Sequence, residues 1–138
     1  MPYIRRTISF VLISGAIAFS TPSTSARHSR THEVRMVSSS APRFEPAEIH
    51  IAAGDTVVFV VVSGAPHNVA FDTTALSPVA TRRLRAAVHD TILPFAGPLL
   101  MKDNERYAVS FAGMPTGRYP FYCMPHMGLQ MRGTVVVE

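Results

Sequence analysis

The hydrophobic positions of the chain repeat mostly with a period of two, which is typical of β-strands. The segment 56–62 differs, because it is an unbroken run of mostly β-branched residues, as expected for a deeply buried strand. Segments that read as strands, with turn residues between them, lie at 32–38, 44–51, 56–62, 69–71, 107–111, 119–123 and 132–138. This pattern predicts an all-β protein with a Greek-key β-sandwich fold.

One stretch between the strands, residues 72–100, lacks this alternation. Within it, Leu84 and Val88 lie four residues apart, which places them on one face of a helix, and Thr81 is a candidate N-cap. We therefore expect one short helix in the region 79–90. The remaining surface of this helix would carry Arg82, Arg83 and Arg85.

The N-terminal segment has the layout of a secretory signal peptide. Arg5 and Arg6 precede an apolar run, and a Ser- and Thr-rich stretch follows it and ends at Ala26. The apolar run is shorter than a bilayer is thick, so we expect no membrane span. We expect a signal peptide at 1–26, a flexible tail at 27–31, one domain at 32–138, and a mature protein that is periplasmic or otherwise exported.

The composition limits the classes of function that the chain can have. With 138 residues, 47% of them hydrophobic, the chain has material for one domain with a packed core. Its single Cys excludes an intrachain disulfide. Without the predicted signal peptide, the chain has eleven basic and nine acidic residues. This excess of positive charge is too small to predict a nucleic-acid partner.

A compact group of metal-ligand residues follows the predicted strand at 119–123. Cys123, His126 and Met131 have the spacing C-x2-H-x4-M, and His67 lies at the end of another strand. Two imidazoles, one thiolate and a weak thioether are the ligand types of a blue copper electron-transfer site. Soft sulfur ligands suit Cu(I), and imidazole suits both oxidation states. The sequence therefore indicates one bound copper ion.

Other interpretations of these residues explain the pattern less well. Cys123 alone would be read as a small buried apolar residue. A catalytic thiol activated by His126 would have no need of Met131, so we do not expect an enzyme. A zinc site would prefer more Cys or His ligands and has no use for a thioether.

Three motifs carry a resemblance to a known family. They are Gly54-Asp55-Thr56-Val57, Pro66-His67-Asn68-Val69 and Tyr122-Cys123-x-Pro125-His126 with Met131. Together they resemble the cupredoxins, and are most similar to the plastocyanin and pseudoazurin branch. The resemblance implies that His67, Cys123, His126 and Met131 bind one type 1 copper. It also implies that Asn68 ties the two ligand-bearing loops together near the thiolate. Pro66 and Pro125 would lie next to the ligands.

The resemblance also predicts a role and shows three departures. The predicted role is a monomeric electron carrier between larger redox proteins, with the ring edge of His126 as the electron port.

The first departure is Gln130, which stands where plastocyanins usually carry Gly. The second is the unusual number of Met residues, Met124 and Met127, on the expected docking face. The acidic docking patch of plant plastocyanins has no counterpart. A copper-delivery protein that uses the same ligands is the alternative function.

Overall fold

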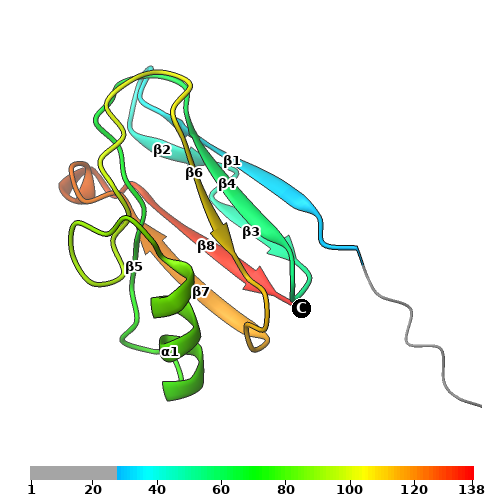
Figure 1. Ribbon diagram of the computed structural model, residues 1–138. Coiled ribbons are helices and arrows are strands. Elements are labelled where there is room, and N and C mark those ends of the chain that lie inside the picture. Colours follow the sequence, from blue (N-terminus) through cyan, green and yellow to red (C-terminus); the bar gives the residue numbers. More distant parts are fainter. Residues whose placement is uncertain (1–27) are drawn as a thin grey trace, which may run out of the picture.

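The alternating segments form two four-stranded sheets in the computed structural model, which describes residues 28–138. One sheet has the order β2 (Arg43–Glu45), β1 (Thr31–Val37), β4 (Thr56–Val61), β6 (Arg106–Ser110). The other has the order β3 (Glu48–Ile51), β8 (Arg132–Val137), β7 (Gly117–Tyr122), β5 (Ala70–Phe71). The two sheets face each other as the layers of a sandwich (Figure 1), and this confirms the predicted fold class.

Aromatic side chains from both sheets meet in the core. The ring of Phe121, on β7, lies edge-on to Phe44 of β2 at 4.7 Å and to Phe59 of β4 at 5.1 Å between centroids. Gly133 pairs with Phe121 across β7 and β8, and a Cβ at Gly133 would lie 2.4 Å from the tip of that ring. Glycine is therefore required there, and the aromatic contacts fix the strand that leads to Cys123.

The prediction of one continuous strand over 44–51 is wrong. The chain leaves β2, which pairs with β1, and enters β3, which pairs with β8 in the opposite sheet. Pro46 lies between the two strands and has no N–H to donate to a ladder, so the strand ends there. The segment thus crosses from one layer of the sandwich to the other.

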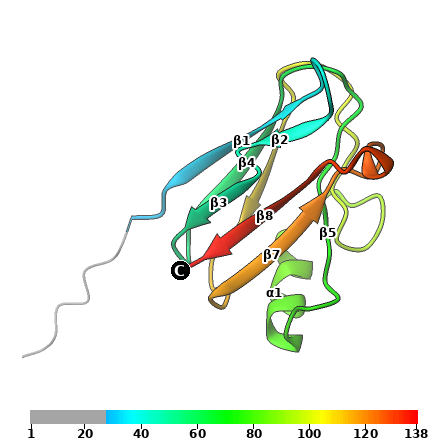
Figure 2. The same ribbon diagram turned by 180° about the vertical axis from the view of Figure 1, so that it is seen from behind.

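The predicted helix is present as α1 (Pro78–Ala87), with Leu84 and Val88 buried as expected. Its N-cap is Ser77, whose hydroxyl accepts a hydrogen bond from the N–H of Ala80 at 3.2 Å. The prediction of Thr81 as the cap is wrong, because Thr81 lies in the first turn and its N–H donates to the Ser77 carbonyl. Pro78 suits the first helical position, where its missing N–H has no partner to lose. Figure 2 shows the chain leaving α1 and returning toward the 3₁₀ turn η1 (Met127–Leu129).

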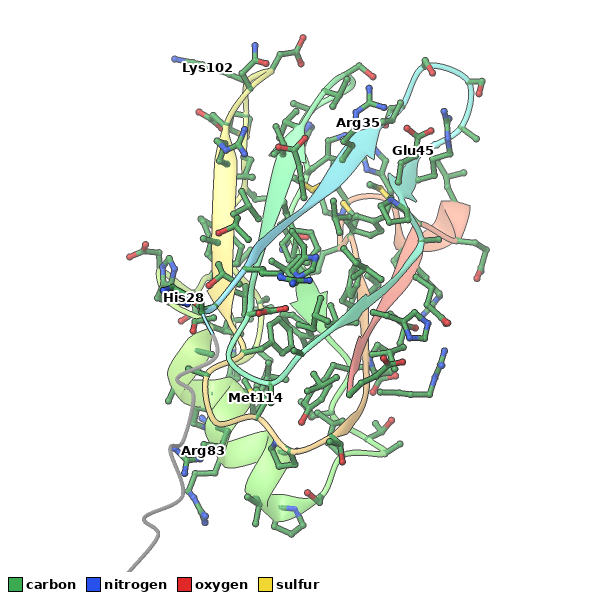
Figure 3. All side chains as sticks on the ribbon, turned by 90° about the vertical axis from the view of Figure 1, so that its right-hand side faces the viewer. His28, Arg35, Glu45, Arg83, Lys102 and Met114 are labelled. Atoms are coloured by element: carbon green, nitrogen blue, oxygen red, sulfur yellow. The ribbon has the colours of Figure 1, made fainter. Side chains whose placement is uncertain are left out.

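The N-terminal part of the domain is held by strand β1. This strand begins at Thr31, one residue before the predicted domain boundary, and pairs in parallel with β4. On its other side, Arg35 forms an ion pair with Glu45 of β2, and the two lie next to each other in Figure 3. The predicted signal peptide lies outside the described residues. None of the helices in residues 28–138 is both long and apolar enough to cross a membrane.

Asp55 connects the start of β1 to the turn before β4. Its carboxylate accepts hydrogen bonds from the N–H of Arg30 at 2.9 Å, the His32 ring at 2.8 Å and the N–H of Ala52 at 3.0 Å. The N–H of Arg30 and the ring of His32, together with Ala52, lower the pKa of Asp55 to about 2. These bonds stabilise the ionised carboxylate, and with it the parallel pairing of β1 with β4.

We expect Asp55→Asn to lower the free energy of unfolding at pH 7, because the ionised carboxylate is bonded only in the folded state. The folded pKa is below the unfolded value of about 4. The contribution of Asp55 is therefore complete above about pH 4 and is lost as the pH falls toward 2. Urea unfolding of both metal-free proteins at several pH values from 7 to 2 measures the difference between their free energies of unfolding. This difference should stay constant down to about pH 4 and shrink between pH 4 and pH 2. A difference that stays constant would contradict this role of the charge.

Candidate metal centre

The loop that follows β7 brings Cys123 to the end of the sandwich. The N–H of Cys123 donates to the carbonyl of Met131 at 3.0 Å, which closes the loop 123–131 at its base. Within the loop, the N–H of His126 donates to the Cys123 carbonyl at 3.2 Å. In Figure 1 this loop is the orange coil between the end of β7 and the start of β8. The spacing of Cys123 and His126 in the sequence is thus that of one hydrogen-bonded turn, and η1 separates His126 from Met131.

His67 reaches the same end of the sandwich from the connection between β4 and β5. It follows β4 after a short turn, and its backbone forms two hydrogen bonds with Leu100, of 3.0 and 2.8 Å. This isolated bridge anchors both the backbone N–H and the carbonyl of His67. The side chain is completely buried.

The side chains of His67, Cys123 and His126 converge on one point. Their potential ligand atoms all lie within 4.8 Å of one another. The Cys123 Sγ atom is 3.7 Å from His67 Nδ1 and 3.4 Å from His126 Nδ1. The two imidazole rings have centroids 4.8 Å apart and are tilted by 50°. One soft sulfur and two imidazole nitrogens thus surround a space of the size that one metal ion requires.

The protonation of these groups suits a metal. The Nε2–H of His67 donates to the Ser63 carbonyl at 2.9 Å, which leaves Nδ1 unprotonated and facing the sulfur. Burial, and to a lesser degree the neighbouring His67, lowers the pKa of His126, which favours the neutral ring that a metal requires. Burial raises the pKa of the Cys123 thiol, although the N–H groups of Asn68 and His126 act in the opposite direction. A bound metal would displace the thiol proton.

Asn68 joins the two loops that carry the ligands. It is completely buried, and its Oδ1 atom accepts a hydrogen bond from the N–H of Met124 at 2.8 Å. Its Nδ2 atom donates to the carbonyl of Gly97 at 3.5 Å. One amide side chain therefore links the His67 segment, the ligand loop and the segment that returns from α1.

The other predicted site residues surround this group. Met131 is completely buried at the base of the loop, where it meets Cys123 through the backbone hydrogen bond described above. Pro66 is half-buried, Pro125 is exposed, and Met124 is half-buried. Met127 is 49% exposed.

One departure from the family pattern, Gln130 in place of Gly, lies at a position of unusual backbone conformation. Its backbone has φ 60° and ψ 30°, the left-handed conformation that closes η1. Glycine adopts this conformation at no steric cost, whereas a side chain adopts it with some strain. The position therefore favours Gly for conformational reasons, and Gln130 still allows the loop to return Met131 to the core.

Several residues that shape the site carry no signal in the sequence. The Ser63 carbonyl selects the tautomer of His67, and Leu100 and Gly97, in the segment after α1, anchor the segment that carries His67 and Asn68. Backbone carbonyls act in most of these contacts, and any residue type supplies one. The turn at Ser63-Gly64 was the available hint, since it lies directly before the His67 motif.

A thiolate and two imidazoles at one end of a Greek-key sandwich define the class of copper-binding cupredoxins. Residues 30–138 match the model of a protein family described as copper binding proteins of the plastocyanin/azurin type, and the chain belongs to this plastocyanin/azurin family. It is 37% identical to a plastocyanin of Prochlorothrix hollandica over 129 residues, which are 93% of this chain and 86% of the relative. It is 35% identical to a plastocyanin of Nostoc punctiforme over 133 residues, 95% and 88% of the two chains.

Solved structures give the same result. The oxidised plastocyanin of Dryopteris crassirhizoma superposes with a TM-score of 0.64 at 30% identity, over 77% of this chain and 99% of that one. The reduced Cu(I) form of an amicyanin mutant superposes with a TM-score of 0.52 at 27% identity, over 78% and 82% of the two chains. Copper is therefore the metal of this chain, and the donor group of two imidazole nitrogens and one sulfur fits it.

We expect Asn68→Ala to lower the free energy of unfolding of the metal-free protein by about 2 kcal/mol, because it leaves the N–H of Met124 and the carbonyl of Gly97 without their partner. Chemical denaturation measures this loss. Because the tie between the loops is lost, the variant should also bind Cu(I) more weakly in a competition assay with a chelator. Stability within about 0.5 kcal/mol of the wild type would show that Asn68 does not hold the two loops.

Proposed function

We propose that the protein is an exported blue copper electron carrier in which His67, Cys123, His126 and Met131 bind one copper ion. The observation that carries this proposal is the convergence of the Cys123 sulfur and two imidazole nitrogens within 4.8 Å at a buried position. Met131 is assigned as the weak fourth ligand from its burial at the base of the same loop and from the family resemblance.

The donors set the charge of the site. One thiolate and three neutral groups leave a net charge of about +1 with Cu(II) and about zero with Cu(I), and copper supplies this single-electron exchange. His67, Cys123 and Met131 are completely buried, and a surrounding of low polarity disfavours the more highly charged state. No Asp or Glu joins this donor group in the described residues. We therefore expect a high reduction potential.

The fold keeps the donors in place during electron exchange. His67 is fixed by its backbone bridge to Leu100 and by the Ser63 carbonyl. Cys123 is fixed by the bond of its N–H to Met131, and the ligand loop is fixed by Asn68. With donors that cannot move far, little reorganisation accompanies the change of oxidation state, and this favours fast transfer.

Electrons would enter and leave through His126. Its ring is half-buried, and its Nε2 atom forms no hydrogen bond within residues 28–138, in contrast to Nε2 of His67. Met124 and Met127 flank it in the sequence, and Leu129 is 63% exposed on the same loop. This apolar surface suits brief contacts with larger redox proteins. The signal peptide that the sequence predicts at 1–26 supports a location outside the cytoplasm.

The copper-loaded, oxidised protein should be intensely blue, because a direct Cys123–Cu(II) bond gives rise to charge transfer from the thiolate. Visible and electron paramagnetic resonance spectra of the reconstituted protein test this. Cys123→Ser is the matched control, and it should lose the colour while the fold is retained. A colourless Cu(II) form of the wild type would contradict the proposal. Rapid loss of the metal to a weak chelator would instead favour a role in copper delivery.

Met131→Leu should keep the blue colour and raise the reduction potential, because the loss of a weak electron donor leaves the higher charge of Cu(II) less compensated than that of Cu(I). Leu has nearly the same volume, so the buried position should tolerate it. Met114→Leu, which changes a buried methionine outside the ligand loop, is the control and should leave the potential unchanged. If Met131→Leu leaves the potential unchanged, Met131 is not a ligand.

A further inference from the structure

The hydroxyl of Ser38 lies beside the nitrogen of His67 that faces away from Cys123. Ser38 follows strand β1, and its Oγ atom is 3.4 Å from His67 Nε2. The same Nε2 atom is 2.9 Å from the Ser63 carbonyl. Two oxygen atoms, from segments 25 residues apart, therefore share one imidazole nitrogen.

The Ser63 carbonyl determines which ring nitrogen of His67 carries the proton. A carbonyl oxygen is only an acceptor, so its distance of 2.9 Å requires a proton on Nε2. With Nε2 protonated, the Ser38 hydroxyl is also an acceptor, at the longer distance of 3.4 Å. The imidazole proton is thus shared between two acceptors, and Nδ1 stays free on the side of Cys123.

Two further contacts hold the Ser38 hydroxyl in this position. The N–H of Ser38 donates to the Ser63 hydroxyl at 3.1 Å. Gly64 has a φ of +74°, and a Cβ at this residue would lie only 2.2 Å from the Cβ of Ser38. A glycine is needed at position 64 for the turn to approach Ser38 this closely. The sequence Ser63-Gly64 and the end of β1 therefore form one unit behind His67.

We propose that Ser38 is a positioning residue for His67: as a second acceptor for the Nε2 proton that the Ser63 carbonyl selects, it holds the ring orientation and makes Nδ1 a stronger donor. This inference rests on the proposed role of His67 as a copper ligand. Partners of this kind, hydrogen-bonded to the far nitrogen of a metal-bound His, orient the ring and raise its basicity. A more basic ring stabilises Cu(II), so Ser38 should lower the reduction potential.

The test compares Ser38→Ala with Ser39→Ala, the same change at the next residue, which is exposed. Ser38→Ala should stay blue, raise the reduction potential and release Cu(I) to a chelator about tenfold faster. In the metal-free protein, nitrogen-15 NMR should show the His67 proton on Nε2, and Ser38→Ala should exchange this proton with water faster than the wild type. Ser39→Ala should match the wild type in each measurement.

A second variant separates the hydroxyl from the rest of the turn. Ser63→Ala keeps the carbonyl that accepts from His67 but removes the bond that aims Ser38, so it should move the potential in the same direction by a smaller amount. An unchanged potential and an unchanged proton exchange in Ser38→Ala would overturn the inference while the proposed function stands. If the wild type took up no copper, the proposed function would fail, and the NMR comparison of the metal-free proteins would still decide the role of Ser38.

Discussion

The site depends on one constraint: the protein itself holds ligand atoms from two distant segments within a few ångströms of each other. Cys123 and His67 are 56 residues apart, yet sulfur and nitrogen lie 3.7 Å from each other. Hydrogen bonds from Asn68, Leu100 and Met131 fix both loops. The cost of ordering these loops is thus met during folding rather than when metal binds.

The sandwich supplies the rigid frame for this constraint. His67 lies in the connection that runs from β4 of one sheet to β5 of the other, and Cys123 directly follows β7, the neighbour of β5. Phe121, two residues before Cys123, contacts rings from β2 and β4 and thereby ties both layers together near the site. Core packing and metal geometry are therefore coupled through a few aromatic contacts.

The sequence predicted the parts of the fold that depend on local pattern. Alternation located most strands, and the spacing of Leu84 and Val88 located the helix face. It failed at Pro46, because alternation continues through a residue at which the chain changes sheets. It failed at Thr81 because Ser77, followed by Pro78, is the better start of the same helix, and propensity alone does not rank two nearby caps.

The proposed ligands could be predicted from the sequence because chemistry restricts copper ligands of this kind to Cys, His and Met. The residues that support these ligands could not be predicted. Ser63 and Leu100 act through backbone groups, which every residue type has, so only the fold reveals them. X-ray absorption spectroscopy of the copper-loaded protein in both oxidation states tests the central claim most directly. The account predicts one sulfur and two nitrogen neighbours at short distance, with little change on reduction. A nearest shell without sulfur, or one that changes its donors on reduction, would contradict it.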